Sequence, residues 1–246
     1  VQFDSAGIRL DDLTASMGGG RIQFGGRVGL QGYLPGELTI TARGEDMRLR
    51  YPEGVRSTVD ADLSISGNVK APTIGGLVTV KSALWSRRID PTGGLLDFGG
   101  GSGVAADPAA PPSAGPAAIP IRFDLEVLVP STLRIENNLA RLVASADLQL
   151  RGTYEKPVLF GRAEVDRGEV TFEGRRYLVT RGAIEFTNPT RIEPFFDVEA
   201  ETRVRVPSQT YRVTVRAAGS MDRLQPELTS DPPLPAADVL ALLFSD

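Results

Sequence analysis

Apolar and polar residues alternate along most of this chain. In residues 122–129, for example, Phe123, Leu125, Val127 and Val129 occupy every second position. Successive side chains of a β-strand point to opposite faces of a sheet, so this period of two is typical of strands. The same alternation recurs in residues 21–30, 37–44, 144–152, 195–206 and 211–219. The pattern predicts an all-β protein whose strands each have one apolar and one polar face.

The C-terminal segment departs from this alternation. Prolines at positions 232, 233 and 235 end the preceding strand, and Pro235 suits the first turn of a helix. An apolar stripe with helical spacing follows, formed by Ala236, Val239, Leu240, Leu243 and Phe244. We expect a short amphipathic helix, either as a cap over the open end of the β-structure or as a docking element. The docking interpretation assigns the contact to Pro232, Pro233, Leu234, Val239, Leu240 and Leu243.

Residues 99–118 differ in composition from the rest of the chain. They consist mainly of Gly, Ala and Pro, and Val104 is their one large apolar residue. Such a segment buries too little apolar surface to offset the entropy of ordering, which indicates a flexible insertion or linker. The predicted organisation is a repetitive β segment over residues 1–98, this linker, and a C-terminal β domain with its helix over residues 119–246.

The two halves of the chain contain a repeat. Residues 61–85 align without a gap on residues 146–170, and the matched positions include Gly67 with Gly152 and Gly76 with Gly161. Repetition of one strand–turn–strand unit favours an elongated, curved, solenoid-like sheet over a closed Greek-key sandwich, although the sandwich remains an alternative.

Composition excludes several classes of function. The net charge is −4 and aromatic residues make up 7% of the chain, so neither a basic surface nor stacking platforms for nucleic acid are expected. The chain has no Cys and no His, which removes thiolate and histidine-based catalysis and the usual zinc sites. No cofactor or metal is predicted. An enzyme is not expected; a carbohydrate-active one would need two carboxyl groups facing each other across a cleft.

The apolar faces of the predicted strands need a cover, and the sequence offers almost no helix to supply it. A sheet with one apolar face must pack on a second sheet, curl on itself or hold something apolar. A trough open along one edge would suit acyl chains. A dry sandwich core is the alternative, and the pattern alone does not decide between the two.

The C-terminal half resembles the C-terminal domain of the TamB family. The similarity covers residues 146–244. Its first motif comprises Gly161, Gly168, Phe172, Gly174, Tyr177, Gly182, Ile184, Phe186, Pro194 and Asp197. Its second motif comprises Ser230, Pro232, Pro233, Leu234, Asp238, Val239, Leu240, Leu242 and Leu243. At position 235 the family has Ser or Thr, whereas this chain has Pro, which removes a side-chain cap from the helix.

The resemblance implies a β-taco, a U-shaped β-structure with an apolar interior that spans the periplasm. It implies a non-enzymatic role in the translocation and assembly module: outer-membrane protein assembly, protein secretion and phospholipid transport between the inner and outer membranes. The implied partners are TamA, which is a BamA-related outer-membrane barrel protein, phospholipid acyl chains and nascent outer-membrane proteins. The parent chain would be anchored in the inner membrane by a segment outside this sequence.

The leading hypothesis is a conduit with an apolar groove. Its predicted lining consists of Leu63, Ile65, Leu148, Leu150, Val165, Phe172, Tyr177, Val179, Ile184, Phe186, Val198, Val213 and Val215. The alternative is a binding module that engages outer-membrane protein strands by β-augmentation without carrying lipid. In that case the apolar face would be merely a core.

Overall fold

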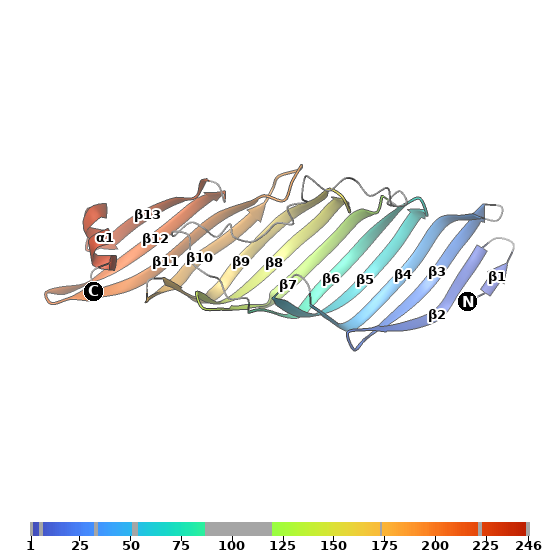
Figure 1. The fold of residues 1–246 in the computed structure, drawn as a ribbon, viewed down its shortest axis with the longest axis horizontal. Coiled ribbons are helices and arrows are strands. Elements are labelled where there is room, and N and C mark those ends of the chain that lie inside the picture. The colour runs from blue at the N-terminus through green and yellow to red at the C-terminus, as the bar shows by residue number, and fades with distance from the viewer. Residues whose placement is uncertain are drawn as a thin grey trace, which may run out of the picture.

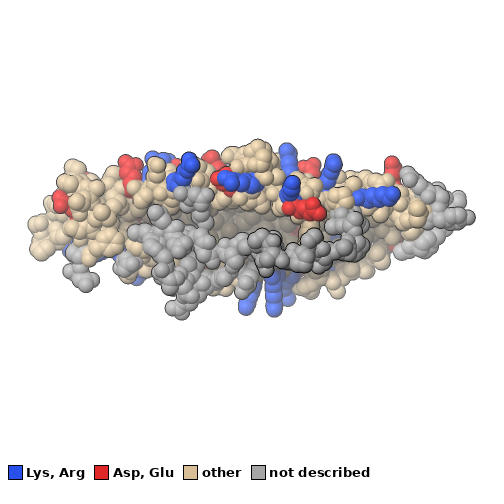
Figure 2. Space-filling view, turned by 45° about the horizontal axis from the view of Figure 1, so that its top comes forward, with Lys and Arg blue, Asp and Glu red and all other residues tan. Residues whose placement is uncertain are grey.

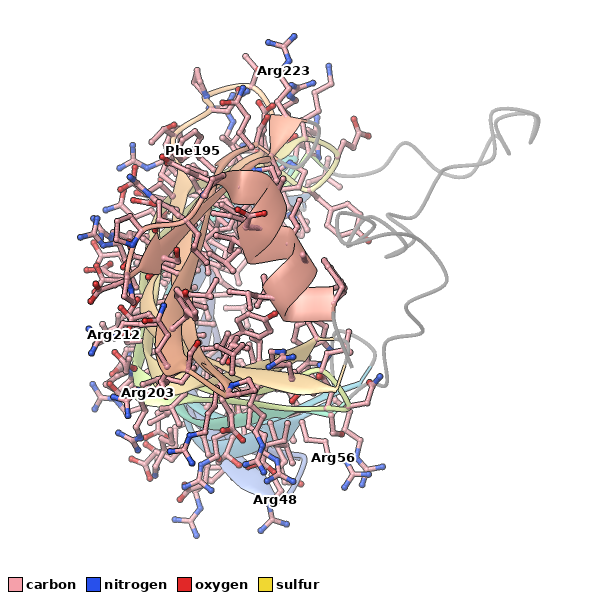
Figure 3. The ribbon with its side chains drawn as sticks, turned by 90° about the vertical axis from the view of Figure 1, so that its left-hand side faces the viewer. Arg48, Arg56, Phe195, Arg203, Arg212 and Arg223 are labelled. Carbon is pink, nitrogen blue, oxygen red and sulfur yellow. The ribbon has the colours of Figure 1, made fainter. Side chains whose placement is uncertain are left out.

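The computed structural model describes residues 2–4, 7–31, 34–50, 54–86, 120–172, 174–220 and 223–244. These residues form one open sheet of 13 strands and one C-terminal helix (Figure 1). The sheet is long, and it curves around a hollow side that is visible when the molecule is viewed from its C-terminal end (Figure 3). The predicted all-β, elongated, curved sheet with a short terminal helix is therefore confirmed, and the described residues contain no second sheet as a sandwich would require.

The strands follow the alternating segments of the sequence. In the N-terminal half they are β1 (Gln2–Asp4), β2 (Gly7–Met17), β3 (Gly20–Gln31), β4 (Leu34–Leu49), β5 (Val55–Asn68) and β6 (Ala71–Trp85). In the C-terminal half they are β7 (Arg122–Glu136), β8 (Ala140–Thr153), β9 (Pro157–Phe172), β10 (Arg175–Phe186), β11 (Pro194–Val206), β12 (Gln209–Ser220) and β13 (Gln225–Asp231). The helix is α1 (Ala236–Phe244).

Each strand pairs with the next one in the sequence, so strand order equals chain order. All pairs are antiparallel except β6 with β7, which run parallel from Thr73↔Arg122 to Trp85↔Ile135. This pairing joins the two halves of the chain into one sheet. The predicted linker, residues 99–118, lies outside the described residues, and the division into ranges 1–98 and 119–246 stays a prediction.

Glycines in the middle of strands allow the sheet to bend sharply. Gly76 on β6 and Gly161 on β9, which the repeat matches, have φ angles of 126° and 114°. A Cβ atom at Gly161 would lie 2.2 Å from the Asp147 carbonyl oxygen, and one at Gly76 would lie 2.1 Å from the Asp62 carbonyl oxygen. Only glycine tolerates both this backbone conformation and this close approach of the neighbouring strand. The sequence repeat therefore corresponds to a repeated bend in the structure.

Bulges add to this curvature. Register shifts interrupt most strand pairs, for example between Gly44 and Met47 on β4 and between Val129 and Leu133 on β7. An extra residue on one strand bends that strand and increases its local twist. The curvature thus comes from glycine bends and bulges distributed along the whole sheet.

Most of the buried apolar residues form two separate clusters on the hollow side. One lies in the N-terminal part and consists of Ile22, Ala42, Met47, Val59 and Ala61. The other lies at the C-terminal end and consists of Tyr177, Ala200, Val204, Val213, Val239 and Leu243. A compact domain of this size would have one contiguous core. Here each strand packs mainly on its neighbours, as in repeat proteins.

Candidate functional site

The strand register sorts the residues of the sheet into an inner and an outer face. Residues opposite each other on adjacent strands share a face, so each pairing extends the assignment to the next strand. Across β4 to β7, for example, Ile40 lies opposite Ile65, Ile65 opposite Ile74, and Ile74 beside Phe123. We call this the inner face, because it is the concave side on which α1 lies (Figure 3). The charged residues of the strands lie mainly on the outer face.

Every residue that the sequence predicts as groove lining lies on the inner face. The set is Leu63, Ile65, Leu148, Leu150, Val165, Phe172, Tyr177, Val179, Ile184, Phe186, Val198, Val213 and Val215. Tyr177 and Val213 are buried, and the others are half-buried. The structure thus brings the predicted residues onto one continuous surface. Their contact with a cargo stays a prediction.

The inner face is almost without charge. Among the strand residues that the structure describes, Arg175 at the start of β10 is the one charged residue that the register assigns to this face. Polar residues such as Ser57 and Thr202 are uncharged exceptions. A face of this composition offers little to an ionic ligand and much to an apolar one.

Helix α1 covers the C-terminal end of the inner face. Val239 is 0% exposed and Leu243 is 7% exposed. Both side chains pack in one cluster with Tyr177, Val204 and Val213 of β10 to β12. The cap interpretation of the helix therefore describes the arrangement in this structure, and the helix occupies space that an apolar cargo would otherwise fill.

Burial beneath the helix affects the titration of Tyr177. Desolvation raises the pKa of its phenol, and the nearby Arg175 cation partly offsets the rise. The phenol is therefore neutral at physiological pH, as suits a side chain within an apolar cluster.

The start of α1 is organised without a side-chain cap at position 235, which is Pro. The carbonyl oxygen of Pro235 accepts hydrogen bonds from the backbone N–H groups of Asp238 (2.9 Å) and Val239 (3.1 Å). The Ser230 hydroxyl oxygen accepts a hydrogen bond from the Leu234 N–H at 3.0 Å. Asp238 adds a negative charge to the first turn, where the helix dipole favours it. Ser230 thus anchors the segment that leads into the helix.

The predicted docking residues lie in different environments. Pro232 and Pro233 are exposed, Leu234 is half-buried and Leu240 is 42% exposed. Val239 and Leu243, described above, are accessible to a partner only if the helix leaves the sheet. Docking through this set stays a prediction, and in the arrangement seen here the exposed members alone could take part.

The outer face is covered by ion pairs between neighbouring strands. Arg43 contacts Asp62 at 2.6 Å across β4 and β5, and Arg216 contacts Asp197 at 3.1 Å across β12 and β11. These hydrogen-bonded carboxylates raise the pKa of both guanidinium groups. Pairs this exposed contribute little to stability, about 0–1 kcal/mol each. These charged groups keep the outer face hydrated, which distinguishes it from the apolar inner face.

The described residues offer no membrane-spanning helix and no cluster of metal ligands. In the described ranges no helix is long and apolar enough to cross a membrane. Nor does this part of the chain bring together three or more Asp or Glu residues in a way that could hold a metal ion. The inner face is therefore the principal candidate surface.

The sequence reasoning missed two features of the surface. The bends at Gly76 and Gly161 shape the inner face, and their signal was present in the repeat as matched glycines. A group of arginines at one margin of the sheet has no signal in the sequence. It is assembled by the parallel pairing of β6 and β7, which brings residues near position 50 close to residues near position 134.

The family comparison agrees with this geometry. The family model described as the TamB C-terminal domain matches residues 11–246, which extends the similarity well beyond residues 146–244 into the N-terminal half. The TamB family works with TamA in the periplasm, in the translocation and assembly module, a transport and assembly system rather than an enzyme. The match and the open curved sheet lead to one conclusion: this chain belongs to the TamB family.

Proposed function

We propose that the inner face is a non-enzymatic conduit for acyl chains in the periplasm. The observation that carries this proposal is the continuous, almost charge-free inner face, most of which is only half-buried. In Figure 2 the hollow side lies in shadow beneath the upper margin of the sheet. Outside the two buried clusters, apolar side chains such as Leu150 and Ile184 retain access to a ligand.

The energetics favour an acyl chain as the occupant. Burial of a methylene group contributes about 0.8 kcal/mol, so a chain lying on the inner face would be stabilised along its whole length. The headgroup would remain in water at the open margin, because the inner face offers no set of charges to replace its hydration. The free energy gained by burial is spread evenly along the inner face, so an acyl chain could slide along it without being trapped in a deep energy minimum.

The module supplies the partners in this proposal. A TamA-like, BamA-related outer-membrane barrel would receive cargo at the C-terminal end, and an inner-membrane anchor of the parent chain would fix the other end. Phospholipid would move between the two membranes, and nascent outer-membrane proteins and secreted proteins would use the same surface. Because α1 occupies the C-terminal end, cargo would leave there only when the helix moves aside.

Lipid retention on the purified protein tests the proposal. We expect native mass spectrometry to detect phospholipid bound to the unsubstituted protein, which is called the parent protein in the comparisons with variants. Replacement of Ile184 by Asn on the inner face of β10 should reduce the bound fraction about tenfold, because an amide in an apolar contact loses more than 1 kcal/mol.

Leu178→Asn is the matched control on the same strand. Leu178 lies on the outer face, opposite Glu169 and Glu201, and is 60% exposed. It should retain as much lipid as the parent protein. Equal losses in both variants, or no lipid on the parent, would count against the conduit.

One observation favours a second function, β-augmentation. Strand β13 ends the sheet and pairs only with β12 among the described strands, so one of its edges is available to another strand. Crosslinks from β13 to outer-membrane protein strands, in a protein that binds no acyl chain, would favour this function over the conduit.

A further inference from the structure

A group of arginines lies at the margin of the sheet where β4 ends and β5 begins. We call Arg48, Arg50, Arg56 and Arg134 the arginine site. Figure 3 places Arg48 and Arg56 at the lower margin, pointing away from the hollow side. All four side chains are exposed. They come from β4, its C-terminal end, β5 and β7, so the site depends on the sheet being intact.

The pairing of four strands sets the spacing of the arginine site. On β5 and β7, Arg56 and Arg134 both lie beside Leu84 of β6. Two strand spacings separate these arginines, which is roughly 10 Å. Arg48 lies opposite Thr58 in the next row. The guanidinium groups thus surround a patch of neutral side chains.

A depression of 670 Å³ lies at this patch. Hydroxyl groups contribute to its surface together with the arginines. Its lining comprises Arg48, Leu49, Arg50, Arg56, Ser57, Thr58, Lys81, Ser82, Ala83, Leu84, Ser131, Thr132, Arg134 and Glu136. Five cations and one carboxylate therefore share it. Arginine and hydroxyl donors around one depression form a surface that suits an oxyanion.

Among the residues that the structure describes, the arginine site has no carboxylate partner. Within the described ranges, no carboxylate oxygen lies within 4.0 Å of a guanidinium nitrogen of the four arginines. Lys81 differs, because Asp46 (2.6 Å) and Asp60 (3.4 Å) already bind its ammonium group.

The opposite margin of the sheet is balanced in charge. There Arg151 contacts Asp124 at 3.6 Å and Arg191 contacts Glu193 at 2.8 Å. Figure 2 shows the same contrast, with red and blue side chains mixed along the upper margin and blue ones projecting from the lower margin. An excess of guanidinium groups at one margin is unexpected in a chain whose net charge is −4.

Clustered guanidinium groups repel one another, and like charges on neighbouring strands destabilise a sheet. A bound anion removes this repulsion. Phosphate oxygens accept paired hydrogen bonds from the planar guanidinium fork, and Arg is the residue most suited to such recognition. The arginine site therefore has the chemistry of a phosphate site.

We propose that the arginine site binds a phosphate group, as an anionic phospholipid headgroup or as free phosphate. Arg56 and Arg134 hold the phosphate from two sides, Arg48 and Arg50 add positive charge, and the hydroxyls of Thr58 and Ser82 complete the surface. The site faces outward and does not depend on acyl chains entering the inner face. One margin of the sheet is thereby attracted to anionic lipid surfaces, although the net charge of the whole chain is negative.

Vesicle binding tests this proposal with the whole chain and an Arg56→Gln/Arg134→Gln variant. Vesicles of phosphatidylcholine are compared with vesicles of phosphatidylcholine and phosphatidylglycerol in equal parts. We expect the parent protein to prefer the anionic vesicles. Each arginine near an anionic surface contributes about a fivefold factor, so the double variant should bind them about 25-fold more weakly.

The matched control is Arg122→Gln/Arg223→Gln, which changes the net charge equally but at the opposite margin of the sheet, where Figure 3 places Arg223. These exposed arginines also lack a carboxylate within 4.0 Å in the described part of the chain. The control should bind anionic vesicles like the parent. Inorganic phosphate or chloride is then added to the vesicle-binding assay at equal ionic strength. If phosphate reduces vesicle binding more than chloride does, free phosphate is a ligand of the site. If the two salts act equally, the ligand is the lipid headgroup. The proposal would be overturned if the Arg56/Arg134 variant bound anionic vesicles as well as the unsubstituted protein, or if the control variant lost as much binding. Either result would count against the arginine site independently of the native mass spectrometry of the inner face.

Discussion

Replacing Val239 with Asp is expected to detach α1 from the inner face. Val239 has no exposed surface and packs among apolar side chains, so its replacement would bury a carboxylate there. An uncompensated buried charge costs about 3–5 kcal/mol, more than a short helix gains by docking. A helix of nine residues is marginal by itself in water, so the detached segment should unfold. Hydrogen exchange should then become fast in residues 236–244 and faster in β10, while β2 to β9 stay protected.

Leu240→Asp is the control for this variant. Leu240 is the next residue of the helix and is 42% exposed, so a carboxylate there remains in water. Exchange in residues 236–244 should match that of the parent protein. If both variants exchange alike, or if Val239→Asp leaves the helix protected, α1 is not held by the contacts described here.

Replacing Gly26 with Ala should destabilise the sheet. Gly26 on β3 has the same geometry as Gly76 and Gly161: its φ angle is 127°, and a Cβ atom would lie 2.1 Å from the Thr39 carbonyl oxygen. Backbone strain at such a position costs about 1–3 kcal/mol before the clash is relieved. We expect a lower urea midpoint and faster hydrogen exchange in β3 and β4.

Gly25→Ala is the neighbouring control. A Cβ atom at Gly25 would lie 3.5 Å from the Thr41 hydroxyl oxygen, which is ordinary contact, and its φ angle is not in the positive range. This variant should be as stable as the parent protein, within about 0.5 kcal/mol. Equal stability of Gly26→Ala and the parent would show that the bend does not require glycine.

The alternation of side chains was sufficient to predict both the strands and their faces. Residues such as Leu63 and Val198 lie on the inner face as predicted, because a period of two fixes which side of a strand each residue occupies. Local pattern also predicted the helix from Pro235 and the stripe that follows. These features depend on neighbours in the sequence, which is why the sequence reveals them.

Features that depend on distant segments were not predictable in this way. The parallel pairing of β6 with β7 joins strands that are far apart in the sequence, and alternation does not encode the direction of a strand. The same stripe that predicts a helix serves equally for docking or for capping. Only the packing of Val239 on Tyr177 and Val213 distinguishes the two in this structure. The arginine site likewise exists only once four strands are placed side by side.

Acyl chains should contact the inner face of the sheet and not its outer face. The chain has no Cys, so a single introduced Cys is a unique attachment point for a fluorophore. Leu150→Cys places the probe on the inner face of β8, and Gln149→Cys places it on the outer face one residue away. Phospholipid with a nitroxide on its acyl chain is then added. We predict strong quenching of the fluorophore at position 150 and little at position 149. Equal quenching at both positions, or none at position 150, would contradict the account.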